Sequence, residues 1–128
     1  MTAIELIDQT VEYYKTHDRG LTKTGCGYLT DEGSMCAVGR CLSQYGLENY
    51  GQFPRGVDSL ICSMIDDSNA PTLCFKPEYH NLIDSPLFCY LQRLHDDTRN
   101  WNKTKNGNDL TTKGKKVVNG LKVTFGDL

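Results

Sequence analysis

No apolar run in this sequence approaches the roughly 20 residues that a membrane-spanning helix requires. The first residues carry acids within their apolar stretch and lack a basic cluster, so they do not resemble a secretory signal peptide. Both absences predict a cytoplasmic protein without membrane contact. With 128 residues, of which 38% are hydrophobic and 23% charged, the chain is expected to form a single globular domain over residues 1–128.

The sequence contains six cysteines but no Cys-x-x-Cys pair. Structural zinc sites favour that pair, because two intervening residues let a tight turn aim both sulfurs at one ion. A site built from Cys26, Cys36, Cys41 and His95 is possible by geometry, but the ligand spacing does not favour it. We therefore predict reduced thiols, as is usual in the cytosol, and neither a metal nor a cofactor.

Motifs of common enzyme classes are also missing: there is no Gly-x-Ser-x-Gly, no Gly-x-x-x-x-Gly-Lys and no His-Glu-x-x-His. No catalytic residue is predicted for this reason. Two catalytic alternatives stay open: Cys36 beside His95 as a thiol nucleophile, and the acid pairs at 66–67 and 96–97 as a divalent metal centre. Each alternative requires groups to converge that the sequence alone does not bring together.

The formal net charge of −2 hides an uneven distribution. Acids outnumber bases up to residue 98, whereas residues 99–128 are basic and hold half of the Lys and Arg residues. Most of these cations are lysines, which are typical of a solvated helix face. Nucleic-acid binding through this segment is therefore not predicted.

Hydrophobic periodicity predicts an α+β fold in which a small β-hairpin packs on four or five α-helices. Thr2 and Glu5 form a capping-box pattern before an amphipathic helix over residues 3–16. Apolar residues at three- and four-residue spacing predict another helix over 57–65. Ser85-Pro86 is a strong start for a further helix, with serine as N-cap and proline at the first helical position.

Two short strands, over 26–29 and 35–38, are predicted around a turn in which Gly33 supplies a positive φ. The other glycines of this region permit a close approach of the backbone to another element or to a ligand. A short helix is expected to begin within residues 37–43. Its free N-terminal amides, with Arg40 beside them, favour an anion such as a phosphate.

Residues 45–55 are predicted to form a loop and residues 68–84 to be irregular, whereas the polar segment 100–108 is predicted to contain a turn at Asn106-Gly107. One turn is expected after Pro77. Asp109 is expected to cap the last helix of the chain.

His95 lies four residues after Leu91 and therefore borders the buried face of the helix that starts at Ser85. It is interpreted either as a packed histidine whose ring bonds to the backbone, or as a base or donor at the edge of a pocket. Asp96 is expected to point elsewhere on the helix, so no His–Asp dyad is predicted. Trp101 either closes the core or lines the same pocket.

Seven tyrosines, one tryptophan and several arginines suit a binding pocket better than they suit catalysis. Aromatic faces stack on flat bases, and arginine can bind a phosphate through two parallel hydrogen bonds. The predicted ligand-binding residues are Tyr28, Arg40, Arg55, His95, Asp96, Arg99 and Trp101.

Two motifs carry a family resemblance. The first runs from Cys26 to Gly39 and combines a Cys-x-Tyr step, a turn and Cys-Ala-x-Gly; the second is Leu-Gln-x-x-His-Asp over residues 91–96, with Trp101 after it. Together they resemble a family of small tailed-phage proteins, over about residues 4–125, that has no established reaction. Glu32 departs from the Asp-Gly turn that is usual in this family.

The resemblance and the missing enzyme motifs lead to one main hypothesis: a phage counter-defence protein that binds a small nucleotide-derived immune signal of the host. It would sequester this ligand in the host cell cytosol without cleaving it. One alternative is inhibition by direct contact with a host protein, and another is a small hydrolase that uses His95 and Asp residues. A homo-oligomer is expected, because pockets in such small chains often form between subunits.

Overall fold

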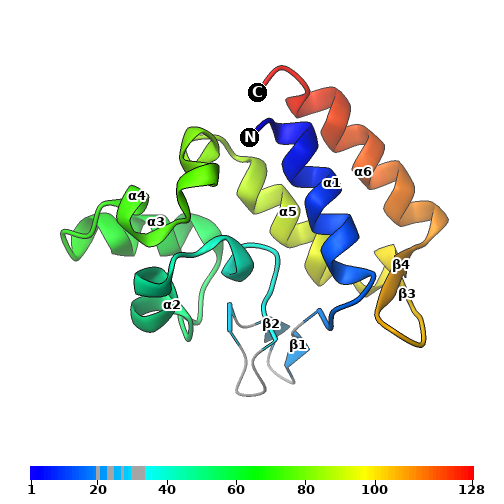
Figure 1. The fold of residues 1–128 in the computed structure, drawn as a ribbon, viewed down its shortest axis with the longest axis horizontal. Helices are drawn as coiled ribbons and strands as arrows, with labels where there is room; N and C mark the ends of the chain where they lie inside the picture. Colours follow the sequence, from blue (N-terminus) through cyan, green and yellow to red (C-terminus); the bar gives the residue numbers. More distant parts are fainter. Residues whose placement is uncertain (20, 23–24, 27, 30–33) are drawn as a thin grey trace.

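The computed structural model describes residues 1–19, 21–22, 25–26, 28–29 and 34–128 (Figure 1). This part of the chain contains six α-helices, three 3-10 helices and two antiparallel strand pairs. The predicted α+β class is confirmed. Within the described residues, no helix is long and apolar enough to cross a membrane.

Three helices from the two ends of the chain pack together: α1 (Ala3–Tyr14), α5 (Leu87–Asp96) and α6 (Thr112–Phe125) (Figure 1). The predicted capping box starts α1, because the Thr2 side chain accepts from the Glu5 amide and the Glu5 side chain accepts from the Thr2 amide. The two chain ends meet where the Ala3 amide donates to the Leu128 carbonyl at 3.1 Å.

The middle of the chain forms the other side of the molecule. It contains α2 (Gln44–Tyr50), α3 (Val57–Asp66), α4 (Pro71–Cys74) and the 3-10 helix η2 (Pro77–Leu82). Helix α3 agrees with the prediction and packs against both α4 and α5. One buried core then runs from α1 through α5 to α3.

Two predictions for the middle of the chain are wrong. Residues 45–55 are not a loop, because the Ser43 hydroxyl accepts from the Gly46 amide at 3.1 Å and starts α2. Gly46 also lets α2 approach the Cys74 carbonyl, where a β-carbon would clash with the backbone. In segment 68–84 the turn expected after Pro77 forms as η2, whereas the helix α4 was not predicted. Tertiary packing overrides the weak helix propensity of these residues.

The hairpin motif forms less strand than predicted. Among the described residues of segments 26–29 and 35–38, the one strand pairing is the isolated bridge between Leu29 and Met35. The predicted turn at Gly33 lies outside the described residues. A two-residue strand pair precedes it, β1 (Leu21–Thr22) with β2 (Gly25–Cys26). Gly39 begins the 3-10 turn η1 (Gly39–Cys41), and its missing side chain lets the backbone of Tyr28 lie against it.

The region after α5 also differs from the prediction. The 3-10 turn η3 (Thr98–Asn100) leads into a second hairpin, β3 (Trp101–Lys103) with β4 (Asn108–Leu110), whose strands were not predicted. The turn that joins them includes the predicted Asn106-Gly107. Asp109 pairs with Asn102 in this hairpin and does not cap α6. The cap is Thr111, whose hydroxyl accepts from the Gly114 amide at 3.0 Å.

Candidate functional site

Arg40 lies in η1 between α1 and η2, and only 5% of it is exposed. Its guanidinium donates to the amide oxygen of Gln9 at 2.9 Å, to the Thr10 hydroxyl at 2.5 Å and to the Tyr79 hydroxyl at 3.4 Å. It also lies over the ring of Tyr13, 5.6 Å from the centroid. Its polar partners therefore come from α1 and η2.

Every one of these partners is uncharged. No carboxylate of the described residues forms an ion pair with Arg40, and its Nε atom has no hydrogen-bond partner there. A buried charge is costly unless an opposite charge and a full set of hydrogen bonds compensate it. Arg40 is thus a buried cation whose charge no carboxylate of the described residues compensates.

The titratable groups around Arg40 do not provide that anion. Burial raises the pKa of the Cys41 thiol to about 11, even though Arg40 and Lys76 lower it. Burial also raises the pKa of the Tyr13 and Tyr79 hydroxyls above their usual value, again against the effect of Arg40. All three groups are therefore protonated and neutral at pH 7.

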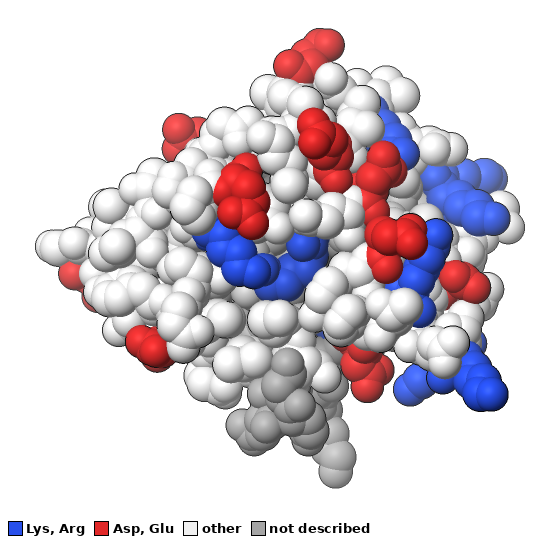
Figure 2. All heavy atoms as spheres, in the orientation of Figure 1, with Lys and Arg blue, Asp and Glu red and all other residues white. Residues whose placement is uncertain are grey.

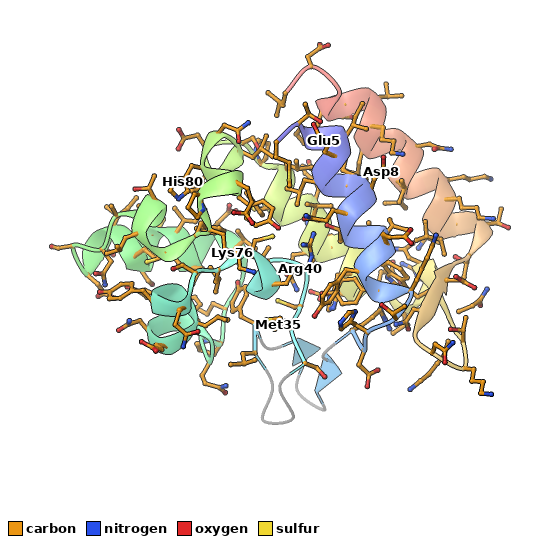
Figure 3. The ribbon with its side chains drawn as sticks, viewed as in Figure 1. Glu5, Asp8, Met35, Arg40, Lys76 and His80 are labelled. Atoms are coloured by element: carbon orange, nitrogen blue, oxygen red, sulfur yellow. The ribbon has the colours of Figure 1, made fainter. Side chains whose placement is uncertain are left out.

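A second cation lies beside Arg40. The backbone amide of Lys76 donates to the Cys41 carbonyl at 2.9 Å, which holds the two segments together, and the Lys76 side chain is half-buried. Lysine and arginine side chains form a blue area near the centre of the face in Figure 2, at the place where Figure 3 labels Arg40 and Lys76. We call Arg40, Lys76, Gln9, Thr10 and Tyr79 the Arg40 site.

The backbone of η1 adds little to this site. The Val38 amide donates to the Gln92 side chain, the Gly39 amide to the Cys36 sulfur, and the Arg40 amide to the Cys36 carbonyl. The expected short helix over 37–43 is only this single turn, and these amides are used within the protein. An anion at this place would be bound by side chains rather than by a helix N-terminus.

His95 is fully buried, with 0% exposure. Its Nδ1 lies 2.8 Å from an Asp96 carboxylate oxygen, and its Nε2 bonds to the Arg19 carbonyl. The expectation that Asp96 points away from His95 is wrong, because Asp96 is the last residue of α5 and its side chain turns back onto the ring. Both ring nitrogens are thus engaged, as in the packed interpretation of this histidine.

Trp101 is also part of the core. Its indole nitrogen donates to the Leu94 carbonyl at 2.9 Å, and its ring packs edge-on against Tyr14. The guanidinium of Arg19 lies 5.9 Å from the same ring. These contacts tie the end of α5 to α1 and to the second hairpin.

The remaining predicted residues lie apart from the Arg40 site. Arg99 is exposed and forms two hydrogen bonds with the Asp97 carboxylate, at 3.0 and 2.9 Å. Tyr28 is buried and donates to the backbone carbonyl of Arg55 at 2.9 Å, while Arg55 itself is exposed. Of the seven predicted ligand-binding residues, Arg40 is the one at this site.

Sequence reasoning missed four members of the Arg40 site: Gln9, Thr10, Lys76 and Tyr79. Thr10 carried a signal, because it lies four residues after Leu6 on the buried stripe of α1. A polar residue on such a stripe needs a partner, and Thr10 donates to the Leu6 carbonyl while it accepts from Arg40. The other members come together only through tertiary packing.

A separate pocket of about 320 Å³ lies between the start of α3 and the outer face of α5. Its polar lining includes Asp58, Cys89, Gln92 and Asp96. The Cys89 thiol donates to Asp58 at 3.0 Å, and burial raises its pKa to about 11, so it is not a thiolate at pH 7.

The residues proposed above for a zinc site do not form one within the described part of the chain. Cys36 and Cys41 are buried, and the Cys41 thiol donates to the Ala37 carbonyl. No group of three or more His, Cys, Asp and Glu side chains that could hold a metal ion occurs among the described residues. The side chain of Cys26 lies outside them.

Comparisons with protein-family models, with curated proteins and with solved structures find no match to this chain.

Proposed function

We propose that this protein is a binding protein for a small phosphate-bearing ligand of the nucleotide kind. The observation that carries the proposal is the burial of the Arg40 guanidinium among neutral partners, with its Nε unpartnered in the described structure. A phosphate placed there would supply the missing negative charge. Hydrogen bonds between charged groups contribute about 1.5–3 kcal/mol each, more than those between neutral groups.

Lys76 supports the same assignment. It brings a second positive charge near Arg40 on the face seen in Figure 3, and it forms no ion pair with a carboxylate of the described residues. Two cations beside each other suit a phosphate, which carries up to two negative charges at pH 7. The ring of Tyr13, stacked on Arg40, offers an aromatic wall beside this place.

We propose binding without cleavage. The Arg40 site and the neighbouring Cys41 and Tyr13 offer thiol, phenol, hydroxyl and amide groups that are neutral at pH 7, and none of them is a general base with a suitable pKa. His95, the base of the hydrolase hypothesis, is buried with both ring nitrogens engaged. The use that we propose for such binding is the sequestration of a nucleotide-derived signal.

The test is calorimetric titration of the protein with adenosine monophosphate, combined with thermal unfolding. Wild type is expected to bind the nucleotide and to gain thermal stability, because a ligand that binds only the folded state stabilises it. Arg40→Met, which keeps the length but removes the charge, is expected to lose both effects. Arg93→Met is the matched control, because Arg93 is exposed on α5 and contacts Tyr90.

Wild type that binds no phosphate-bearing compound, or an Arg40→Met variant that binds as tightly as wild type, would contradict the proposal. Chromatography of the ligand after a long incubation separates binding from turnover. Recovery of intact nucleotide supports sequestration, and release of inorganic phosphate or nucleoside overturns it.

A further inference from the structure

The amide oxygen of Gln9 occupies a special position in the Arg40 site. It accepts from Nη1 of Arg40 at 2.9 Å and from the Tyr79 hydroxyl at 2.8 Å. Yet Gln9 is an exposed residue on the outer side of α1, whereas Arg40 and Tyr79 are buried. An exposed side chain therefore provides the acceptor for two buried donors.

We infer that Gln9 holds the place of a ligand oxygen, and that a phosphate monoester binds by displacing the Gln9 amide from Arg40 and Tyr79. This inference rests on the proposed function. It adds the class of ligand, a phosphate monoester, and the contact that the ligand replaces, which is that of the Gln9 amide. The displaced side chain can turn into solvent, because it is exposed and long. The two donors stay in place, because both belong to buried residues.

A phosphate can displace the Gln9 amide because it carries the negative charge that Arg40 lacks as a partner. A neutral amide oxygen satisfies the donor geometry of Arg40 but does not neutralise its charge, whereas a phosphate oxygen does both. Thr10 keeps its position during the exchange, since its hydroxyl also donates to the Leu6 carbonyl. The exchange thus replaces one acceptor without leaving a buried donor unpaired.

The acids around the site restrict the ligand to one compact phosphate. Glu5 and Asp8 lie on the same helix as Gln9 and are exposed, and Figure 3 shows them on the part of α1 that leads towards the N-terminus. Asp8 forms an ion pair with Lys122 of α6, so this lysine is already paired with a carboxylate. Further phosphates would add negative charge to a face that already carries carboxylates, and like charges repel. A nucleoside monophosphate fits this arrangement better than a triphosphate or a nucleic-acid strand.

The test compares two substitutions of Gln9 in titrations with adenosine monophosphate. Gln9→Glu provides a built-in carboxylate for Arg40, so it is expected to weaken nucleotide binding at least about tenfold and to raise the thermal unfolding temperature. Gln9→Ala frees the two donors and is expected to strengthen binding a few-fold. Asn119→Asp, at an exposed position of α6, is the control with the same change of net charge.

The outcomes separate this inference from the proposed function. If wild type binds adenosine monophosphate and Gln9→Glu binds it equally well, displacement of Gln9 is wrong although the protein binds phosphate. If wild type binds no phosphate compound at all, the proposed function fails, and the inference fails with it. Adenosine triphosphate that binds more tightly than the monophosphate would overturn the restriction to one phosphate.

Discussion

Nη1 of Arg40 lies 2.9 Å from the amide oxygen of Gln9, where a buried guanidinium usually meets a carboxylate. The neutral partner leaves the positive charge of Arg40 uncompensated within the described structure, and the nearby thiol and phenols stay protonated at pH 7. This relationship links the packing of α1 to the proposed ligand.

Removal of the Arg40 charge is expected to cost the fold little. In Arg40→Met, the Thr10 hydroxyl still donates to Leu6 and the Tyr79 hydroxyl still donates to Gln9, so no buried hydroxyl loses its only partner. Replacement of buried charges by apolar groups of similar volume is often neutral or stabilising. We expect the free energy of unfolding in urea to stay within about 1 kcal/mol of wild type or to rise. A loss of several kcal/mol would show that the charge is structural.

Gly39→Ala is expected to be strongly destabilising. A β-carbon at this position would overlap the backbone carbonyl of Tyr28, and backbone cannot move aside as a flexible side chain can. We expect a loss of more than about 3 kcal/mol in the free energy of unfolding, as is typical of severe overpacking.

Gly120→Ala is the matched control for this prediction. Gly120 lies within α6, and a β-carbon there would meet no heavy atom within 4 Å. Alanine is the better helix former, so this variant is expected to gain about 0.5–1 kcal/mol. Equal effects of the two substitutions would contradict the close approach of Gly39 and Tyr28.

The sequence predicts those parts of the fold that depend on local signals. The capping box of α1 and the apolar stripe of α3 are local signals, and both helices form where they were predicted. Helix α2 and the hairpin β3–β4 were missed, because their residues have weak intrinsic preferences and are ordered by packing. Asp109 and Thr111 are both good N-cap residues, and only the three-dimensional structure decides between them.

The candidate site likewise combines a residue that could be predicted from the sequence with residues that only tertiary packing brings together. Arg40 was predicted from its chemistry, but Gln9, Lys76 and Tyr79 are distant in sequence and reach it through the packing of α1 and η2. His95 and Trp101 belong to motifs that carry the family resemblance, yet both are buried and bonded to the backbone. A motif residue can therefore be a packing residue, and no local pattern distinguishes the two.

His95→Ala tests the structural role of this histidine. The substitution removes the bonds of the ring to Asp96 and Arg19 and leaves a cavity beside Tyr14. We expect the free energy of unfolding to fall by about 2–4 kcal/mol. Nucleotide affinity of the folded variant, measured at low temperature, should equal that of wild type. Loss of affinity with unchanged stability would instead place His95 in a binding site.

The stability of the protein in acid should depend on Asp97, which pairs with Arg99 and Lys113. Hydrogen bonds from Arg99 and Lys113 hold the pKa of Asp97 well below its usual value, so the folded state binds this proton less readily than the unfolded state. The stabilisation is therefore present above the unfolded pKa of about 3.9 and is lost as the pH falls below it. In Asp97→Asn, the unfolding temperature should change less between pH 6 and pH 3 than in wild type. Asp127→Asn, at the exposed chain end, should behave as wild type does.

The central claim is that Arg40 binds a ligand phosphate. It is tested most directly by calorimetric titration of wild type, Arg40→Met and Gln9→Glu with adenosine monophosphate under one buffer condition. The account predicts saturable binding at one site in wild type, no measurable binding in Arg40→Met, and at least about tenfold weaker binding in Gln9→Glu. Equal binding by all three proteins, or none by wild type, would contradict it.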